Sequence, residues 1–303
     1  MTLTVSLLAD GLIVQSADHR LLEIPSGKIV TNFEKKQFVV QLSGPCLATI
    51  SFAGLGAVEG YPTSQLLYDT ALKAGGPGQV SLDQFIEDLR RNATKWLRRV
   101  PVDNRHHSFV VAGIELVEDE VVTKVSLVSN YQTITGQEGL DLQVDNSVHA
   151  SESFAVSSYV VGEPIVLVAG MHAAVPRSDR LALTRMVRNR RRTIELARRL
   201  AYINRWAALR AEDNVSPECT TAALLLGCTQ INAMTRAHRE GEYDVAIDVV
   251  MTGVDQRRII EEIWHKEGMT GTPHMRGSAA GAVSLNGTTT GSSYANPDDV
   301  LLT

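Results

Sequence analysis

The second residue of the chain, Thr2, is the one whose position alone could confer chemistry. Met1 precedes it, and methionine aminopeptidases remove Met before a small second residue, so we expect the mature chain to begin with Thr2. A threonine hydroxyl is a poor nucleophile until a base takes its proton. At a chain terminus the residue's own α-amine, with a pKa of about 7.7 to 8.0, can be that base. Thr2 could therefore attack a carbonyl and form an acyl-enzyme ester.

Other residues that could assist such a nucleophile follow at intervals along the first fifty-four positions. They are Asp18 in the run Asp18-His19-Arg20, the pair Lys35-Lys36, and Gly54 after Phe52-Ala53. Taken singly, each is ordinary: a turn with a surface ion pair, a solvated strand edge and a loop glycine. Their order relative to Thr2 is what suggests a site.

These residues lie at the ends of predicted β-strands. Residues 4–8 and 12–17 are apolar runs joined by Asp10-Gly11, which is a strong hairpin signal. Residues 37–42 and 46–52 predict two more strands on either side of a Ser-Gly-Pro turn. The first fifty residues therefore predict a sheet whose first strand starts almost at the chain terminus.

The rest of the chain alternates between helical and strand patterns. Ser81 predicts a helix N-cap, and Gln84 three residues later would complete a capping box. Helices are expected over residues 63–73, 81–100 and 178–212 (with a break near 189–193), and strands over residues 108–115, 121–128, 154–170 and 220–229. This order suits an α/β (α+β) fold of four layers, an α/β/β/α sandwich with two sheets face to face.

The polar stretches in this setting resemble those of proteasome β-type subunits and of the peptidase subunit of the related bacterial ATP-dependent protease. Both are N-terminal-nucleophile (Ntn) hydrolases. The family begins with Thr-x-Thr, as in Thr2-Leu3-Thr4, and its second strand follows a Gly and ends in Asp-x-Arg, as in Asp18-His19-Arg20. A Lys then opens a strand, and the next strand ends in a small residue plus Gly, as in Ala53-Gly54. The resemblance extends to about residue 230.

The resemblance implies a role for each matched residue. The matches are Thr2 as nucleophile, Asp18 as the buried aspartate, Arg20 as the structural arginine, Lys36 (or Lys35) as the catalytic lysine, Gly54 as the oxyanion-hole donor, and Asp213 with Ser216 as the pair that holds the amine of the nucleophile. Phe52 matches the base of the main specificity pocket, which predicts a preference for small or slim side chains. Ala169 stands where the family's Gly-Ser-Gly turn has serine.

The function implied is a threonine-type amide-bond hydrolase, a peptidase that acts without metal or cofactor on a peptide or amide substrate. The resemblance also implies a cytoplasmic homo-oligomer and allows an unfoldase partner. Two alternatives stay open. One is a non-catalytic proteasome-like assembly protein, which is favoured by Ala169 and by the position of Lys36, about two residues later than in the family pattern. The other is a small-molecule amidase or peptide ligase.

Composition and residue spacing argue against several other classes of protein. The formal net charge of −5 gives no overall basic footprint for nucleic acid. No apolar run approaches the roughly 18 residues of a membrane span, and we expect no signal peptide. Three cysteines fit a reducing compartment. His106, His107 and His149 lack the paired spacing of metal ligands.

Domain organisation follows from these patterns. Residues 1–230 are expected to form the Ntn-hydrolase domain, and residues 268–303 a flexible tail rich in Gly, Ser, Thr and Asn. Residues 231–267 are expected to form a C-terminal helical extension, either a helix alone or a hairpin with a helix, with the helix at 257–266. The arginine-rich part of the long helix predicts a solvated face or a contact between subunits in preference to a nucleic-acid site.

Overall fold

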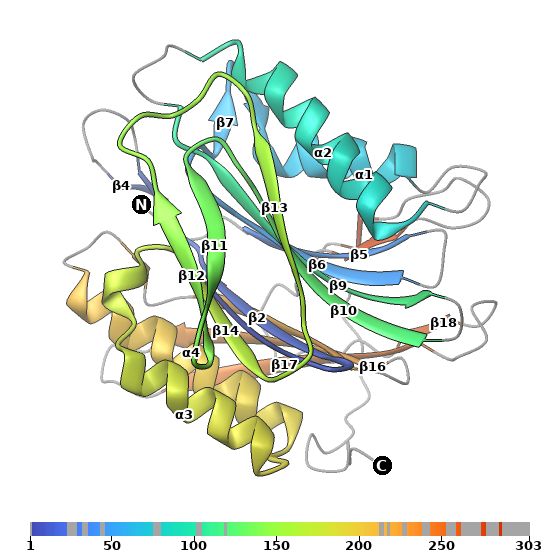
Figure 1. Ribbon diagram of the computed structural model, residues 1–303, viewed down its shortest axis with the longest axis vertical. Helices are drawn as coiled ribbons and strands as arrows, with labels where there is room; N and C mark the ends of the chain where they lie inside the picture. Colours follow the sequence, from blue (N-terminus) through green and yellow to red (C-terminus); the bar gives the residue numbers. More distant parts are fainter. Residues whose placement is uncertain are drawn as a thin grey trace.

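The computed structural model of the chain describes residues 2–22, 29–31, 36–42, 46–74, 80–100, 105–117, 120–211, 215–216, 219–225, 229–237, 243–252, 259–261, 274–276 and 285–286. These residues combine four α-helices with two large β-sheets, so the fold is of the mixed α+β kind (Figure 1). None of the helices in these ranges is long and apolar enough to cross a bilayer.

The first sheet contains the N-terminal strand and runs in the order β11-β12-β14-β1-β2-β15-β16-β17-β18. Its strands are β1 (Leu3–Ala9), β2 (Leu12–Asp18), β11 (Gln132–Glu138), β12 (Asp141–Asn146), β14 (Ile165–Gly170), β15 (Cys219–Leu225), β16 (Thr229–Ala237), β17 (Tyr243–Thr252) and β18 (Ile259–Glu261). β1 and β2 pair antiparallel across the predicted turn, where Gly11 has a φ of 63°. This left-handed conformation explains why a glycine follows Asp10.

The second sheet runs in the order β13-β10-β9-β6-β5-β19-β20. Its strands are β5 (Gln37–Gln41), β6 (Cys46–Ala53), β9 (Ser108–Val117), β10 (Glu120–Ser129), β13 (Ala155–Val160), β19 (His274–Arg276) and β20 (Leu285–Asn286). Two short pairs accompany the sheets: β3 (Leu21–Leu22) with β4 (Ile29–Thr31), and β7 (Ala57–Val58) with β8 (Tyr61–Pro62).

Each large sheet has a pair of helices on one face (Figure 1). The helices are α1 (Thr63–Ala74) and α2 (Leu82–Leu97) on the second sheet, and α3 (Arg177–Arg188) and α4 (Thr193–Arg210) on the first. A short 3-10 turn, His172–Ala174, precedes α3. The predicted break in the long helix is confirmed, since α3 ends at Arg188 and α4 begins only at Thr193.

Ser81 caps α2 as the sequence predicts. Its side chain accepts a hydrogen bond from the Gln84 backbone N–H at 3.2 Å. The Gln84 amide donates to Asp88 instead of returning to Ser81, so the second half of the expected capping box is replaced by an i,i+4 pair on the helix surface.

Successive residues of the central strands face two different cores. In β1, Val5 packs with Leu3 and Leu7 against α3 and α4, whereas Leu8 packs against the second sheet. In β9, Val111 packs toward α1 and α2, and its neighbour Val110 faces the first sheet. Three apolar clusters result: one between each sheet and its helices, and one between the two sheets.

The region after residue 230 differs from the expected helical extension. Its described parts are strands, with β16 and β17 continuing the first sheet antiparallel from β15. Residues 259–261 form β18, so the helix expected at 257–266 is wrong there. The sequence of β17, Tyr-Asp-Val-Ala-Ile-Asp-Val-Val-Met-Thr, alternates in the period of a strand and not of a helix. Within the expected flexible tail, β19 pairs parallel with β5.

Candidate active site

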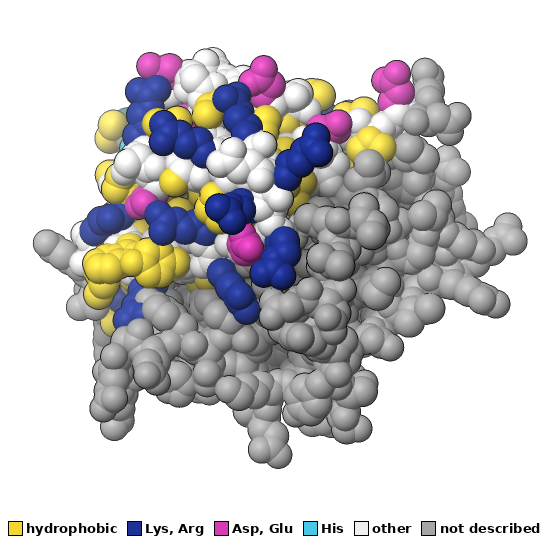
Figure 2. Space-filling view, turned by 90° about the horizontal axis from the view of Figure 1, so that it is seen from below, with side chains coloured by type: hydrophobic (Ala, Val, Ile, Leu, Met, Phe, Trp, Pro, Cys, Tyr) yellow, Lys and Arg dark blue, Asp and Glu magenta, His cyan; other side chains and the backbone are white. Residues whose placement is uncertain are grey.

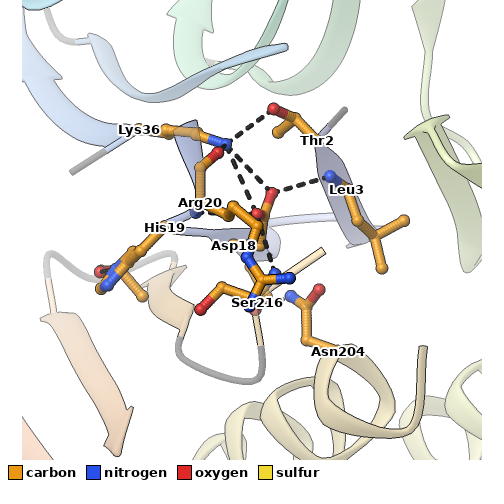
Figure 3. Close-up of polar contacts among 10 residues, drawn as sticks. Thr2, Leu3, Asp18, His19, Arg20, Lys36, Asn204 and Ser216 are labelled. Carbon is orange, nitrogen blue, oxygen red and sulfur yellow. Dashed lines mark hydrogen bonds and ion pairs between the residues drawn. The ribbon is translucent and has the colours of Figure 1, made fainter. Parts of the chain in front are cut away.

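The ends of three elements from both sheets bring Thr2, Asp18 and Lys36 together. Thr2 precedes β1, Asp18 ends the paired strand β2, and Lys36 precedes β5 in the other sheet. Figure 3 shows the Lys36 side chain pointing toward both Thr2 and Asp18. The register of the β1–β2 hairpin fixes Thr2 relative to Asp18. The packing of the second sheet on the first brings Lys36 to both of them.

Lys36 makes the central contacts of this group. Its Nζ donates to the Thr2 hydroxyl Oγ1 at 2.7 Å and lies 3.4 Å from each carboxylate oxygen of Asp18. It also donates to the backbone carbonyl of Arg20. The Lys36 side chain is fully buried, and a charged lysine is tolerated there because three acceptors match the three donors of an ammonium.

Asp18 joins the surrounding segments. Its Oδ1 accepts from the backbone N–H of Leu3 at 2.8 Å. Its Oδ2 accepts from the backbone N–H groups of Arg20, at 3.0 Å, and Ser216, at 3.3 Å. With the lysine, these donors fill the acceptor capacity of a carboxylate and fix the start of β1 beside the end of β2.

The backbone of Thr2 is held from β14. Met171 N–H donates to the Thr2 carbonyl at 3.1 Å. A Cβ on Gly170 would lie only 1.9 Å from that same carbonyl oxygen, and Gly170 has a φ of +81°. Only glycine combines this backbone conformation with so close an approach. Gly170 therefore positions Thr2. The sequence shows only that a glycine ends an apolar strand, and it does not show the contact with Thr2.

Gly54 lies in a turn just beyond β6, and the backbone connects this turn to Lys36. Phe52 N–H donates to the Lys36 carbonyl at 3.1 Å, two residues before Gly54. Gly54 has a φ of +119°, and a Cβ there would lie 2.3 Å from the His106 carbonyl oxygen. The next N–H, of Leu55, donates to His107 Nδ1 at 2.9 Å.

The prediction that Phe52 narrows a substrate pocket is not supported. Phe52 is fully buried in the cluster beneath α1 and α2, where its ring stacks on Phe38 and His107. Along β6 the side chains alternate, so Phe52 points to the helix side of the second sheet. A cavity of about 240 Å³ opens between α1 and α2, and its lining contains none of the predicted site residues.

The other predicted site residues have mixed outcomes. Arg20 is buried, and its backbone N–H and carbonyl both take part in the group. Ser216 is buried and contributes its backbone N–H to Asp18. Met1, Lys35 and Asp213 lie outside the described residues. Ala169 is buried between the sheets and carries no hydroxyl.

His107, whose spacing in the sequence does not predict a metal ligand, has aromatic surroundings. It packs against the rings of Phe52, Trp96, Phe109 and Phe154. Burial lowers the pKa of His107 to about 3, because the charged imidazolium would lose its hydration. The imidazole is therefore neutral near pH 7. No local sequence signal identifies it, since its contacts come from four separate segments.

Comparisons with known proteins identify structural neighbours only. The sequence matches no family model and no curated protein. Anbu (ancestral beta-subunit) from Yersinia bercovieri is 11% identical with a TM-score of 0.48, covering 74% of this chain and 81% of that one. Anbu from Hyphomicrobium sp. strain MC1 is 13% identical with a TM-score of 0.46, covering 84% and 88%. The structure titled helical assembly of the Anbu complex from Pseudomonas aeruginosa is 16% identical with a TM-score of 0.43, and the match covers 75% of this chain and 81% of that one. Values this low carry no functional argument.

Proposed function

We propose that this chain is an N-terminal threonine hydrolase of the proteasome β type, which cleaves amide bonds of peptides with Thr2 after removal of Met1. The observation that supports it most is the 2.7 Å contact between Thr2 Oγ1 and Lys36 Nζ, in a buried group completed by Asp18. Buried ionisable groups that surround a hydroxyl with specific charge partners are candidates for a functional site.

The proposal includes the four-layer α/β/β/α sandwich of the Ntn type. Three apolar clusters in succession support this arrangement, because four layers stacked on one another enclose three interfaces. The ends of both sheets then meet at Thr2 and Lys36, which would place the reaction at one rim of the space between the sheets.

The proposed reaction begins with the α-amine of Thr2 taking the hydroxyl proton. Oγ1 attacks the substrate carbonyl, and the Lys36 ammonium stabilises the oxygen as its negative charge develops. The Gly54 N–H would donate to the tetrahedral oxyanion. The amine leaves with a proton, and water hydrolyses the acyl ester that remains on Thr2. Asp18 holds Lys36 in place, and Asp213 with Ser216 would orient the amine.

Intact-mass measurement tests the proposal directly. We expect the purified chain to lack Met1 and to gain one equivalent of a β-lactone probe, and Thr2→Ser to retain labelling that Thr2→Ala loses. Thr4→Ala is the matched control, because Thr4 is a buried threonine two residues further along β1 and should label normally. Full peptidase activity in protein that retains Met1 would disprove the α-amine mechanism.

A non-catalytic assembly protein is the second candidate, and Ala169 is the observation that favours it, because the serine expected there is missing. A folded chain without adduct or turnover would support this candidate. Labelling by the probe with hydrolysis of small amides, but not of peptides, would instead support a small-molecule amidase.

We also propose that the chain is a homo-oligomer that uses the face of α3 and α4. Residues 177–210 contain eleven arginines and two acidic residues, whereas the whole chain has a net charge of −5. The remaining surface is therefore strongly acidic, so a second copy offers the complementary charge. Figure 2 shows Lys and Arg side chains spread over this side of the molecule, with an apolar cluster at its edge.

A further inference from the structure

The turn that follows β6 is held by the imidazole of His107. Leu55 N–H donates to His107 Nδ1 at 2.9 Å, so Nδ1 must carry the lone pair and the proton of the neutral ring is on Nε2. Nε2 is buried and finds no hydrogen-bond partner among the described residues. An imidazole buried with its Nε2–H unpaired costs free energy. Its presence in the core therefore indicates that the hydrogen bond at Nδ1 has a function.

The backbone before His107 contacts the same turn. A Cβ on Gly54 would lie 2.3 Å from the His106 carbonyl oxygen and 2.9 Å from both Cα and Nδ1 of His107. The Gly54 backbone thus lies directly against this segment. Because a trans peptide is planar with N–H and carbonyl opposed, capture of Leu55 N–H also fixes the direction of the Gly54 carbonyl.

The position of His107 is itself fixed from several sides. Its backbone N–H donates to Asn130 Oδ1 at 2.9 Å, and the Asn130 amide donates to the carbonyls of Arg105 and Ser151. The ring lies edge-on to Trp96 of α2 and to Phe109 of β9, with centroids 5.2 Å and 4.6 Å apart. A ring so enclosed can act as a rigid acceptor.

From these contacts we infer that His107 is a positioning residue: its neutral Nδ1 holds the Gly54–Leu55 peptide and so restrains Gly54, whose own N–H, in the preceding Ala53–Gly54 peptide, is the proposed oxyanion donor. This inference rests on the proposed function. The turn reaches the nucleophile through the backbone, since Phe52 N–H donates to the carbonyl of Lys36, whose Nζ contacts Thr2. Release of Leu55 N–H would let the Gly54 backbone rotate, and the Gly54 N–H would lose its fixed direction.

Two substitutions separate the acceptor from the packing of the ring. The Asn oxygen occupies nearly the place of Nδ1, so His107→Asn keeps the acceptor and loses ring contacts. His107→Phe keeps the ring volume and loses the acceptor. We expect His107→Asn to melt at a lower temperature with kcat within about threefold of wild type. We expect His107→Phe to stay folded while kcat falls about 10-fold to 100-fold and KM changes less than about twofold.

Two further variants complete the design. Phe154→Leu removes a neighbouring ring, and it should lower stability without changing kcat. If His107→Phe does not fold, His107→Gln replaces it, because the Gln oxygen lies near Nε2 and cannot accept from Leu55; it should lose the activity that His107→Asn retains. Amide exchange at Leu55 should be slow in wild type and His107→Asn, and fast in the variant without an acceptor.

The outcomes distinguish this inference from the proposed function. Unchanged kcat in His107→Phe, or activity that falls only in proportion to stability across all the variants, overturns the role of His107 and leaves Thr2 as the nucleophile. A wild-type chain that forms no Thr2 adduct and shows no turnover overturns the proposed function first, and the role of His107 with it.

Discussion

The Lys36 ammonium has an acceptor for each of its three protons, and one of these acceptors is Thr2, the proposed nucleophile. Asp18 and the Arg20 carbonyl fix the other two directions. The lysine therefore cannot swing away from Thr2 without leaving a charge unsatisfied in a fully buried place. Such preorganisation is what electrostatic stabilisation of a developing alkoxide requires.

Replacing Lys36 should therefore abolish turnover. We expect Lys36→Ala to lower kcat/KM by about 10²-fold or more, while Asp18 keeps its three backbone donors and the chain stays folded. Lys35→Ala is the matched control and should cost much less. Hydrolysis of a fluorogenic peptide gives the rates, and circular dichroism the fold. If Lys35→Ala is the inactive variant, the assignment is off by one residue. If both variants hydrolyse the peptide at the wild-type rate, neither lysine takes part in the reaction and the proposed mechanism is wrong.

Gly170 offers a test of the position of Thr2. A methyl group at this residue would meet the Thr2 carbonyl at 1.9 Å on a left-handed backbone, so Gly170→Ala must displace the N-terminus. We expect loss of the Thr2 adduct and a drop of at least about 1–2 kcal/mol in the free energy of unfolding. Gly162→Ala, where a Cβ meets nothing within 4 Å, should change neither. Normal labelling of Gly170→Ala would show that Thr2 has another anchor.

At the scale of residues, Thr2, Asp18 and Lys36 could be located from the sequence because strand ends fix them. The burial of Phe52 beneath α1 and α2 could not be predicted, since which face of a strand a residue occupies depends on pairing that the family match does not reveal. His107 could not be predicted at all. His107 accepts a hydrogen bond from a turn about fifty residues away. A contact over such a separation produces no periodic pattern in the sequence.

Among the elements, α2 begins where the sequence predicts, directly after its N-cap Ser81. Ser81→Ala removes the side chain that accepts from Gln84 N–H, and should lower the free energy of unfolding by about 1 kcal/mol. Ser178→Ala is the control, because Ser178 lies exposed within the first turn of α3, whose N-cap is Pro176. Urea denaturation of both variants gives the difference. Equal stabilities would mean that packing alone determines where α2 begins.

The strands after residue 225 show where prediction of elements failed. The alternation of apolar and polar residues in β17 is visible in the sequence, and a hairpin was one of two alternatives there, but the helix expected at 257–266 is replaced by β18 at residues 259–261. By contrast, the Asp10-Gly11 turn and the Ser81 cap were predicted because each has a local chemical cause. Elements defined by caps and tight turns can be predicted from the sequence. Strands that form only by pairing with a distant segment cannot be predicted without knowing the pairing in the sheet.

For the whole molecule, His107 links stability to pH. Its pKa falls from 6.5 to about 3 on folding, and the groups around it are aromatic rings without charge. Between these pH values the unfolded chain binds a proton that the folded chain does not. Stability from this group is therefore complete above about pH 6.5 and is lost as the pH falls, by up to about 1.4 kcal/mol per pH unit.

The difference between wild type and His107→Phe isolates this effect, because all carboxylates are common to both. Urea unfolding at pH 7, 6, 5 and 4 should show wild-type stability falling more steeply than that of the variant. Parallel pH profiles would mean that the pKa of His107 is the same in the folded and the unfolded chain, which contradicts a pKa lowered by burial.

The face of α3 and α4 carries the prediction about assembly. Tyr202, Trp206 and Leu209 are 41%, 41% and 62% exposed, and the first two rings pack edge to face beside the arginines of α4. Aromatic rings next to cations on one helix face are typical of interface cores and not of open surface. We therefore expect a homo-oligomer, at least a dimer, in which this face meets acidic surface of a second copy.

Light scattering measures the result. Wild type should exceed the 33.0 kDa of one chain at micromolar concentration, and the double substitution Tyr202→Ser with Trp206→Ser should shift the mass toward one chain. Val160→Ser, which replaces an exposed apolar residue on β13, should leave the assembly intact. A clean wild-type monomer would contradict the prediction. It would also count against the peptidase, because a lone subunit offers nothing to keep folded proteins away from Thr2.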